Sequence, residues 1–416
     1  MRIIHTSDWH LGHTLHEVSR EGEQRAFLDW LLDTIAARHA DALLICGDIF
    51  DSANPPASAQ RLWYGFLAEA RRRFPRLAIV AVGGNHDSAA RLDAPEPVLG
   101  EFGIRVMGGV PYGDDGTVLW DRLVVPLHDG AGTVGAWVVA VPYLRPADLP
   151  PVPEGEGDPL VEGVRRFYAE AIAAANRRRH PDHPLLVTGH CYMTGTTLSE
   201  LSERKILGGN QHALPAELFG EGVAYAALGH LHLPQSVGGS EHIRYSGAPL
   251  PLSLGEAEYP NQVLLVEFEG ETFKSVEPIR VPRAVEMRRI PETGALPLDG
   301  LLPILCALPE NDQNASAETP PYLEVCVALD RPDPTLRQRI AAALSGRAAR
   351  LMKITPVYPG SAGPLAAMAP ERSLRDFTPE EVFVQRYRSS FDADPPSEFL
   401  AAFHTLVEEV SGEVAP

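Results

Sequence analysis

Five short stretches of the chain combine Asp, Asn and His at spacings that suit metal chemistry. Along the chain they are Asp8-Trp9-His10, Gly47-Asp48-Ile49-Phe50-Asp51, Gly84-Asn85-His86-Asp87, Gly189-His190 and Gly229-His230-Leu231-His232. Carboxylate and amide oxygens are hard donors and imidazole nitrogens are borderline donors. The mixture therefore suits Mn²⁺, Fe²⁺ or Zn²⁺ better than Mg²⁺, Ca²⁺ or a structural zinc bound by thiolates.

The number of candidate ligands indicates more than one ion. Seven are too many for one ion and about right for two: Asp8, His10, Asp48, Asn85, His190, His230 and His232. A carboxylate such as Asp48 can bridge two metals roughly 3.5–4 Å apart, which is the spacing used for in-line attack on phosphorus. The stretches therefore predict a binuclear centre for phosphate chemistry.

Each stretch follows a run that predicts a buried β-strand, because the run is short, apolar and bounded by glycine. These runs are Arg2–Thr6, Ala42–Cys46, Ala78–Val82, 185–188 and 223–228. In α/β sheets, groups at the carboxyl ends of strands converge on one crevice. A single His-x-His pair or Asn-His turn is more often ordinary packing or surface. Five such stretches at strand ends instead favour a metal centre.

The order of these stretches resembles the calcineurin-type metallophosphoesterase superfamily. The opening residues 1–12, MRIIHTSDWHLG, and the stretches GDIFD and GNHDS are similar to its DNA-repair nuclease branch. Residues 244–253 and 374–386 narrow the resemblance to one family of bacterial nuclease subunits. It covers essentially the whole chain, is firmest in residues 1–280 and is loosest in residues 290–370.

The resemblance implies two divalent ions, taken as Mn²⁺, and metal-bound hydroxide as the nucleophile. At the matching positions, one ion would be held by Asp8, His10 and His232. The other would be held by Asn85, His190 and His230, and Asp48 would be the carboxylate that bridges the two.

The resemblance also implies two catalytic residues that are not ligands. His86 would contact the scissile phosphate and protonate the leaving 3′-oxygen or stabilise charge on it. Asp51 occupies the position whose residue orients that histidine, although a helix N-cap or turn role is the alternative. Asp87 could equally be a turn carboxylate, and Trp9 is expected to form a wall of the site rather than a stacking platform.

Composition limits how the chain could hold nucleic acid. The net charge of −19 argues against extended binding of phosphates. DNA contacts are therefore expected to be local or shared with a partner, with Arg20 and Arg91 as the better phosphate candidates. Arg71–Arg73 and Arg177–Arg179 end predicted helices, where the helix dipole already favours cations.

The location of the protein is expected to be cytoplasmic and nucleoid-associated. Four cysteines without paired spacing favour thiols in a reducing compartment. No run approaches the roughly 20 apolar residues that span a bilayer. Since a strand is predicted directly after Met1, no signal peptide is expected.

Residues 1–282 are predicted to form the nuclease domain, an α/β four-layered metallophosphoesterase β-sandwich flanked by helices. Its opening half alternates strands with helices over Glu21–Arg38 and Ala57–Arg73. Strands are expected over 118–125 and 135–141, followed by a helix over 160–179.

Residues 283–358 predict a small α/β capping and DNA-recognition domain with the order strand, helix, strand, helix, strand. Residues 359–372 are rich in Gly, Pro and Ala and predict a linker. Residues 373–416 contain two helical patterns. Those C-terminal helices are expected to dock on a partner's coiled coil, and folding back on the core is the alternative.

The function implied by the resemblance is that of a Mn²⁺-dependent DNA exonuclease and endonuclease that processes double-strand ends and hairpins. The implied partners are an SMC-type ATPase with a long coiled coil and a second copy of this chain within a heterotetramer. The partner would use the ATP, because no Gly-x-x-x-x-Gly-Lys-Ser/Thr loop occurs here. The alternatives are a cyclic-nucleotide phosphodiesterase or phosphatase, which would not need residues 282–416, and a non-enzymatic scaffold, which should lack metal ligands or the equivalent of His86.

Overall fold

The computed structural model divides into two compact units, Met1–Ala284 and Val285–Pro416. The residues that it describes are 1–153, 155, 157–197, 213–220, 222–311, 319–358, 379–391, 394–396, 399–400 and 402–403. The predicted linker at 359–372 and most of the second C-terminal helical pattern lie outside this set. Among the described residues, no helix is both long and apolar enough to cross a membrane.

Among the described residues, the first unit contains two six-stranded sheets. In spatial order, the first sheet consists of β14 (Thr272–Arg280), β13 (Gln262–Glu269), β1 (Arg2–Thr6), β4 (Ala42–Cys46), β5 (Ala78–Val82) and β6 (Ile104–Met107). The second consists of β11 (Gln235–Val237), β12 (Ser240–Tyr245), β10 (Tyr225–Gly229), β9 (Leu185–His190), β8 (Val134–Val139) and β7 (Val124–His128). The run β1-β4-β5-β6 is parallel, and so is the run β8-β9-β10-β12.

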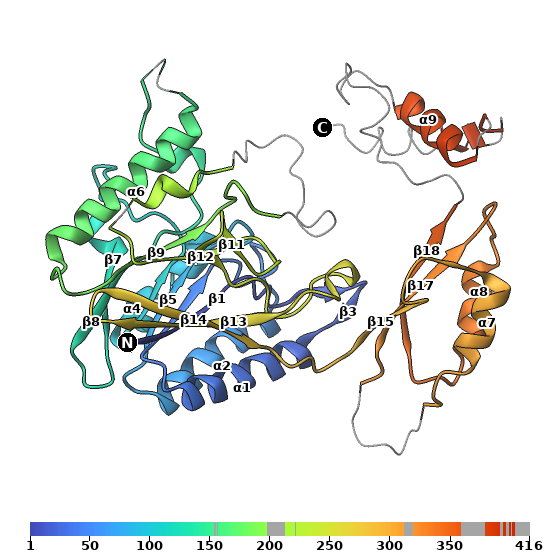
Figure 1. Cartoon of the computed structure of the whole chain (residues 1–416), viewed down its shortest axis with the longest axis horizontal. Coiled ribbons are helices and arrows are strands. Elements are labelled where there is room, and N and C mark those ends of the chain that lie inside the picture. The colour runs from blue at the N-terminus through green and yellow to red at the C-terminus, as the bar shows by residue number, and fades with distance from the viewer. Residues whose placement is uncertain are drawn as a thin grey trace. The chain divides into compact units, whose positions relative to one another are not determined.

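The two sheets pack face to face with helices outside. Leu44 and Val138 belong to the apolar layer between the sheets. The helices α1 (Glu21–Arg38) and α2 (Ala57–Arg73) cover the first sheet, and α6 (Pro159–Arg178) covers the second (Figure 1). Because β4 is buried along its whole length, its sequence is continuously apolar rather than alternating. The four-layered fold predicted from the sequence is confirmed.

One predicted strand is wrong in part. Residues 118–125 contain the helix α5 (Trp120–Leu123), and the strand β7 starts only at Val124. Trp120 packs edge-on against Phe167 of α6 with ring centroids 4.9 Å apart, a tertiary contact that overrides local strand propensity. The other short elements of this unit are β2 (Thr14–Leu15), β3 (Val18–Ser19), α3 (Ala89–Asp93), α4 (Glu96–Glu101), η1 (Pro146–Asp148), η2 (Ala216–Phe219) and η3 (Leu254–Glu256).

The second unit contains a parallel sheet covered on one face by two helices. Its strands are β15 (Met287–Ile290), β16 (Leu296–Pro297), β17 (Tyr322–Ala328) and β18 (Arg350–Val357), and its helices are α7 (Leu298–Cys306), α8 (Leu336–Ala343) and α9 (Pro379–Phe391). Leu301, Val325 and Ile340 form the core between the sheet and α7 and α8. The predicted alternation of strands and helices is confirmed. The helix α9 stacks Phe383 on Phe403 with ring centroids 4.4 Å apart.

Candidate metal centre

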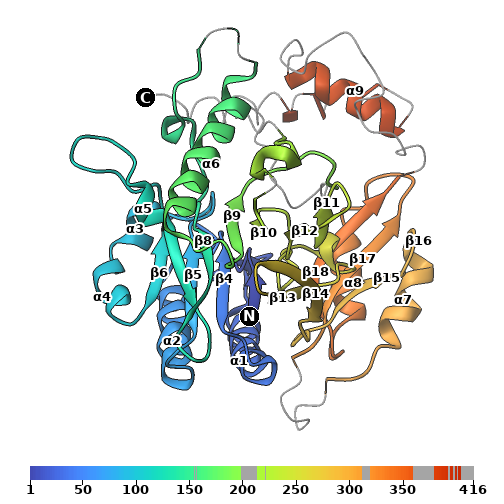
Figure 2. The same cartoon turned by 60° about the vertical axis from the view of Figure 1, so that its left-hand side comes forward.

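The candidate ligands converge where the carboxyl ends of the two sheets meet. The loop after β1 runs beside the loop after β4, since Asp8 N–H donates to the Gly47 carbonyl and His10 N–H to the Asp48 carbonyl, both at 3.0 Å. The ends of β9 and β10 lie side by side in the second sheet (Figure 2). Among the described residues, possible ligand atoms within 4.8 Å of one another form three groups around these loops: Asp8, His10 and His232; Asp48, His190 and His230; and His10, Asp51 and His86. The first two groups contain predicted ligands alone.

Several of these residues adopt backbone conformations that L-residues rarely adopt. Asp8, His10, Asp48 and His230 have φ angles of 55°, 45°, 49° and 101°. Such positions cost free energy and persist only where the surrounding structure enforces them, commonly at functional sites. The loops are thus bent to present ligand atoms at the expense of local stability.

Glycines allow the sheets to approach closely at this point. A Cβ atom on Gly229 would lie 1.9 Å from the Cys46 carbonyl oxygen, and one on Gly47 would lie 2.1 Å from Nδ1 of His190. A Cβ atom on Gly84 would lie 2.2 Å from an Asp48 carboxylate oxygen. These distances are far below contact distance, so the glycines in the motifs are required by packing.

Asp48 lies between the histidines of both groups. Its Oδ2 is 3.2 Å from Nε2 of His190 and 3.6 Å from Nε2 of His10, while its Oδ1 accepts the backbone N–H of His86 at 2.9 Å. Burial opposes ionisation of Asp48, but the neighbouring His190, together with His10 and His86, outweighs it and lowers the pKa of Asp48. Burial alone would lower the pKa of His190, and the Asp48 carboxylate raises it to about 9. The carboxylate thus attracts positive charge from both sides.

The imidazoles are held through their Nδ1 atoms. Nδ1 of His10 lies 3.2 Å from a carboxylate oxygen of Asp51, and Nδ1 of His190 lies 2.9 Å from the Cys46 carbonyl oxygen. Nδ1 of His232 lies 3.0 Å from a carboxylate oxygen of Glu256. Nε2 of His10 is buried without a hydrogen-bond partner. A buried ring nitrogen that lacks a hydrogen-bond partner and lies beside the Asp48 carboxylate is suited to bind a cation.

One further candidate ligand, Asn85, is uncharged. Oδ1 of Asn85 lies 2.9 Å from Nε2 of His190 and 3.0 Å from Nδ1 of His230. Burial lowers the pKa of His230 to about 3, with His190 adding to the effect, so His230 is neutral. All seven predicted ligands are therefore brought together, and the donor set fits two borderline divalent ions.

Asp51 contacts both His86 and His10. Nδ1 of His86 lies 2.9 Å from the backbone carbonyl of Asp51, whereas the Asp51 carboxylate faces His10. Asp51 therefore contacts His86 through its main chain. The rings of His86 and His10 are in contact, with centroids 4.8 Å apart and an interplanar angle of 78°.

Sequence reasoning missed Glu256, which lies after residues 244–253 and carries no motif of its own. The turn role considered for Asp87 is what the structure shows, since its carboxylate accepts backbone N–H groups of Ile49, Phe50 and Gly84. Burial, followed by the nearby Asp48 charge, raises the pKa of Asp87 to about 6.

Trp9 is buried behind the ligands, and its ring packs edge-on against Phe27, Trp63 and Phe66. It belongs to the helix-facing core and does not serve as a stacking platform.

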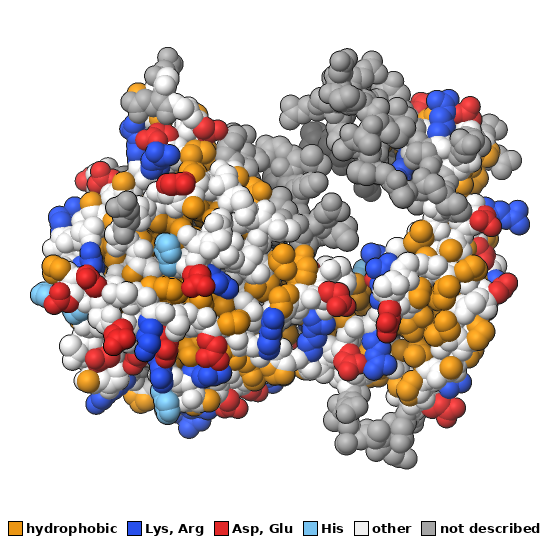
Figure 3. Space-filling model, in the orientation of Figure 1, with side chains coloured by type: hydrophobic (Ala, Val, Ile, Leu, Met, Phe, Trp, Pro, Cys, Tyr) orange, Lys and Arg blue, Asp and Glu red, His pale blue; other side chains and the backbone are white. Residues whose placement is uncertain are grey.

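Arg20, one of the two candidates for contact with phosphate, is not available for that contact in this structure. Its guanidinium is buried and forms two hydrogen bonds with Glu23, at 2.8 and 2.7 Å. Arg91 is exposed and donates to Asn54 at 2.8 Å. Arg71 donates to the backbone carbonyls of Pro75 and Leu77, which follow its helix. On the face shown in Figure 3, basic and acidic side chains of the first unit are interspersed rather than gathered by sign.

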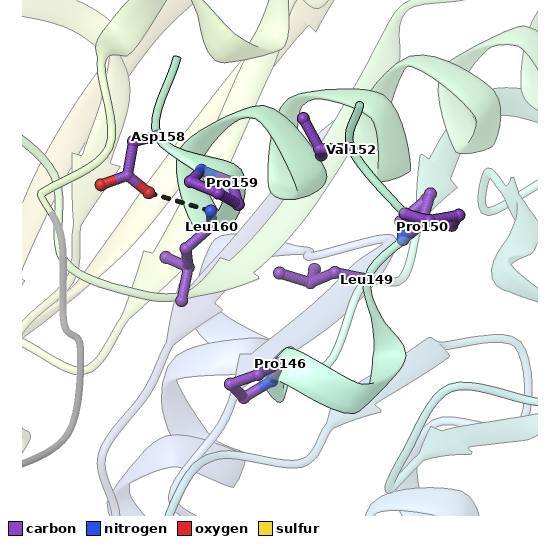
Figure 4. Close-up of a pocket in the computed structure, with 8 residues that line it drawn as sticks. Pro146, Leu149, Pro150, Val152, Asp158, Pro159 and Leu160 are labelled. Atoms are coloured by element: carbon purple, nitrogen blue, oxygen red, sulfur yellow. Dashed lines mark hydrogen bonds between the residues drawn. The ribbon is translucent and has the colours of Figure 1, made fainter. Parts of the chain in front are cut away.

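A separate cavity of about 410 Å³ lies at the start of α6 and is lined mostly by prolines and leucines (Figure 4). Its carboxylate, Asp158, caps the helix by accepting N–H groups of Leu160 and Val161. Because that group is already committed to the helix, the cavity is a weaker candidate site than the seam between the sheets.

Comparisons with known proteins agree with this geometry. Residues 1–234 match the calcineurin-like phosphoesterase family, and residues 283–391 match the type 5 capsule protein repressor C-terminal domain. The chain is 42% identical to the SbcD subunit of nuclease SbcCD from Rhodobacter capsulatus over 93% of this chain and 94% of that protein. It is 31% identical to the Escherichia coli K12 protein of that name over 99% of each chain, and 35% identical to the Bacillus subtilis one over 64% and 66%. The chain therefore belongs to the calcineurin-like phosphoesterases and, within them, to the family of SbcD nuclease subunits.

Proposed function

We propose that this metal-dependent DNA nuclease hydrolyses phosphodiester bonds at a binuclear Mn²⁺ centre located at the seam between its two sheets. The observation that carries the proposal is the position of Asp48 between His10 and His190, with ligand groups on both sides. The ligand assignment follows the sequence prediction: Asp8, His10 and His232 on one ion, Asn85, His190 and His230 on the other, and Asp48 between them.

The bound ions would supply Lewis acidity and lower the pKa of the attacking water. The protein's own contribution is to fix the donors. Strained loops hold Asp8 and Asp48 in place, and hydrogen bonds at Nδ1 determine how the rings of His10, His190 and His232 are turned. Rigid placement of this kind lowers the cost of reorganisation during the reaction.

We assign His86 the role of a group that stabilises or protonates the leaving oxygen. Because a carbonyl can only accept, the contact with the Asp51 carbonyl requires a proton on Nδ1 of His86. Nε2 is then the atom that can exchange a proton with a substrate oxygen, and donation requires the imidazolium form. Asp51 supports this role through its carbonyl, and its carboxylate supports His10.

The partners are proposed from the name of the relatives, which are SbcD subunits of nuclease SbcCD. We propose that the chain binds an SbcC-type, SMC-like ATPase with a coiled coil and that two copies of it form a dimer within a heterotetramer. Its substrates would be duplex and hairpin DNA, and it would act at the nucleoid in the cytoplasm. Several basic side chains of the first unit are paired with acidic ones, such as Arg38 with Glu277 and Arg73 with Asp33. That pairing supports a DNA grip shared with the partner.

The proposed domains are nuclease 1–282, capping 283–358, linker 359–372 and docking helices 373–416. Support for docking comes from α9 and its neighbours, where Tyr387 contacts Phe391 and Phe399, and Phe399 remains 48% exposed. Deleting residues 371–416 should leave a folded nuclease that no longer co-purifies with the ATPase. Retained complex formation would favour folding back on the core.

The function is tested with purified chain plus partner, Mn²⁺ and end-labelled duplex or hairpin DNA, alongside bis-p-nitrophenyl phosphate and a phosphopeptide. We expect DNA cleavage that requires Mn²⁺ and is lost in Asp48→Ala. Rapid hydrolysis of the phosphopeptide with intact DNA would instead favour a phosphatase on the same fold. Full activity in excess EDTA would contradict the metal assignment.

A further inference from the structure

We propose that Glu256 is a positioning residue of the metal centre, whose carboxylate sets the tautomer and orientation of His232. The inference rests on the proposed binuclear function and adds to it a residue outside the ligand motifs. Its consequence is confined to the ion that His232 shares with Asp8.

The contacts of Glu256 show a carboxylate fixed at both oxygens. Oε1 lies 3.0 Å from Nδ1 of His232, and Oε2 accepts the backbone N–H of Leu252 at 2.7 Å. The residue is fully buried, at 0% exposure, at the end of the short helix η3. Burying a carboxylate is costly unless hydrogen bonds compensate for lost water, so this arrangement needs a reason.

The chemical consequence lies in which ring nitrogen of His232 carries the proton. A carboxylate oxygen accepts, so Nδ1 of His232 donates and Nε2 of the neutral ring keeps its lone pair. Only a nitrogen with a lone pair can bind a metal. A carboxylate on the opposite nitrogen also increases the basicity of the ligand.

The two ligand groups differ in this respect. His10 also faces a carboxylate, that of Asp51, while Nδ1 of His190 faces the neutral carbonyl of Cys46. The ion held by Asp8, His10 and His232 is therefore surrounded by more negative charge, and Glu256 should affect that ion and not the other.

The test is the isosteric substitution Glu256→Gln in the full-length protein. A side-chain amide offers one acceptor and one donor group, and the Leu252 N–H can only donate. Either the contact with Nδ1 of His232 is lost, or that nitrogen accepts from the amide and the ring proton moves to Nε2, which then has no lone pair for a metal. Titration calorimetry with Mn²⁺ should show one binding event weakened about 10–100-fold and the other unchanged. Asp93→Asn is the matched control, because that carboxylate also accepts a backbone N–H, from Gly108, and should leave both events unchanged.

Two Mn²⁺ binding events of wild-type strength in folded Glu256→Gln would overturn the inference while leaving the binuclear function intact. Fewer than two events in the wild type would instead overturn the binuclear function. A second measurement needs no variant at position 256. In metal-free wild type with ¹⁵N-labelled histidine, assigned through His232→Gln, nuclear magnetic resonance should place the His232 proton on Nδ1. A proton on Nε2 would overturn the inference.

Discussion

The two sheets contribute different chemistry to the candidate metal centre. The loops that follow strands of the first sheet carry mostly oxygen donors among the candidate ligands, and they carry the negative charge: Asp8, His10, Asp48 and Asn85. The candidates at the ends of strands of the second sheet are all imidazoles: His190, which is the last residue of β9, and His230 and His232, which follow β10. Neither set alone offers two complete ligand groups. Close packing of the sheets is therefore a condition for the activity as well as for stability.

The difference extends to how the donors are held. In the first sheet, left-handed residues and backbone hydrogen bonds between neighbouring loops fix Asp8 and Asp48. In the second, hydrogen bonds at Nδ1 hold His190 and His232. Asp8 and Asp48 thus depend on loop geometry, and His190 and His232 depend on groups elsewhere in the chain. Two residues cross this division, since His10 of the first set is also held at Nδ1 by Asp51, and His230 of the second set has a φ of 101°.

The largest expected effect comes from Asp48→Ala, which removes the carboxylate between the two ligand groups. We expect no measurable nuclease activity and loss of Mn²⁺ binding well beyond the about 10–100-fold cost of changing a residue that only supports a ligand. Cleavage assays and elemental analysis measure this. Asp33→Ala removes an exposed carboxylate paired with Arg73 and should change neither quantity. Two tightly bound ions in Asp48→Ala would contradict the bridging position.

His86→Ala separates chemistry from metal binding. Losing a general acid or charge-stabilising contact should lower the rate by about 10²–10⁴-fold, while both ions remain bound. Single-turnover cleavage and metal content are measured on the same samples. Loss of one ion would mean that His86 is itself a ligand.

Gly47→Ala should disturb the seam from the first-sheet side. Its methyl group would meet the His190 ring at 2.1 Å on a backbone with φ of 89°, so we expect the free energy of unfolding to fall by about 2–5 kcal/mol. Gly65→Ala in α2, where the new methyl meets nothing within 4 Å, should instead be stabilising by about 0.5–1 kcal/mol. Denaturant unfolding of the metal-free proteins compares them, and equal stabilities would argue against the close approach.

The smallest effect concerns pH. The Asp48 carboxylate raises the pKa of metal-free His190 to about 9, and a bound ion must displace that proton. Mn²⁺ affinity should therefore rise about tenfold per pH unit between pH 7 and 9. The stability of the metal-free protein should change in the opposite direction, falling as pH rises. The protonated His190 contributes its full stabilisation below pH 6.5, and this contribution is lost as pH rises through about 9. Calorimetry across this window would contradict the assignment if the affinity were flat.

Sequence motifs led to candidate ligands that lie close together in the structure, but not to the contacts that support them. Strand ends such as those of β1 and β4 were predictable because apolar runs ending in Gly or Asp have a local signature. The hydrogen-bond contacts of the histidine Nδ1 atoms have no such local signature in the sequence. Glu256 reaches His232 from 24 residues away, and the Asp51 carboxylate reaches His10 rather than His86.

The same limit explains the errors away from the centre. Arg20 looked like a surface cation near a ligand loop, but its burial depends on Glu23 and on the carbonyl of Pro251, 231 residues away. Trp120 adopts a helical conformation because of its contact with α6. Both outcomes depend on partners that only the packed fold brings together.

The most direct test of the central claim is a crystal structure of the full chain soaked with Mn²⁺, with anomalous scattering recorded at the manganese edge. The account predicts two peaks roughly 3.5–4 Å apart with Asp48 between them. One peak should be bound by Asp8, His10 and His232, and the other by Asn85, His190 and His230. A single peak, or two peaks bound by residues of only one sheet, would contradict a centre built across the seam.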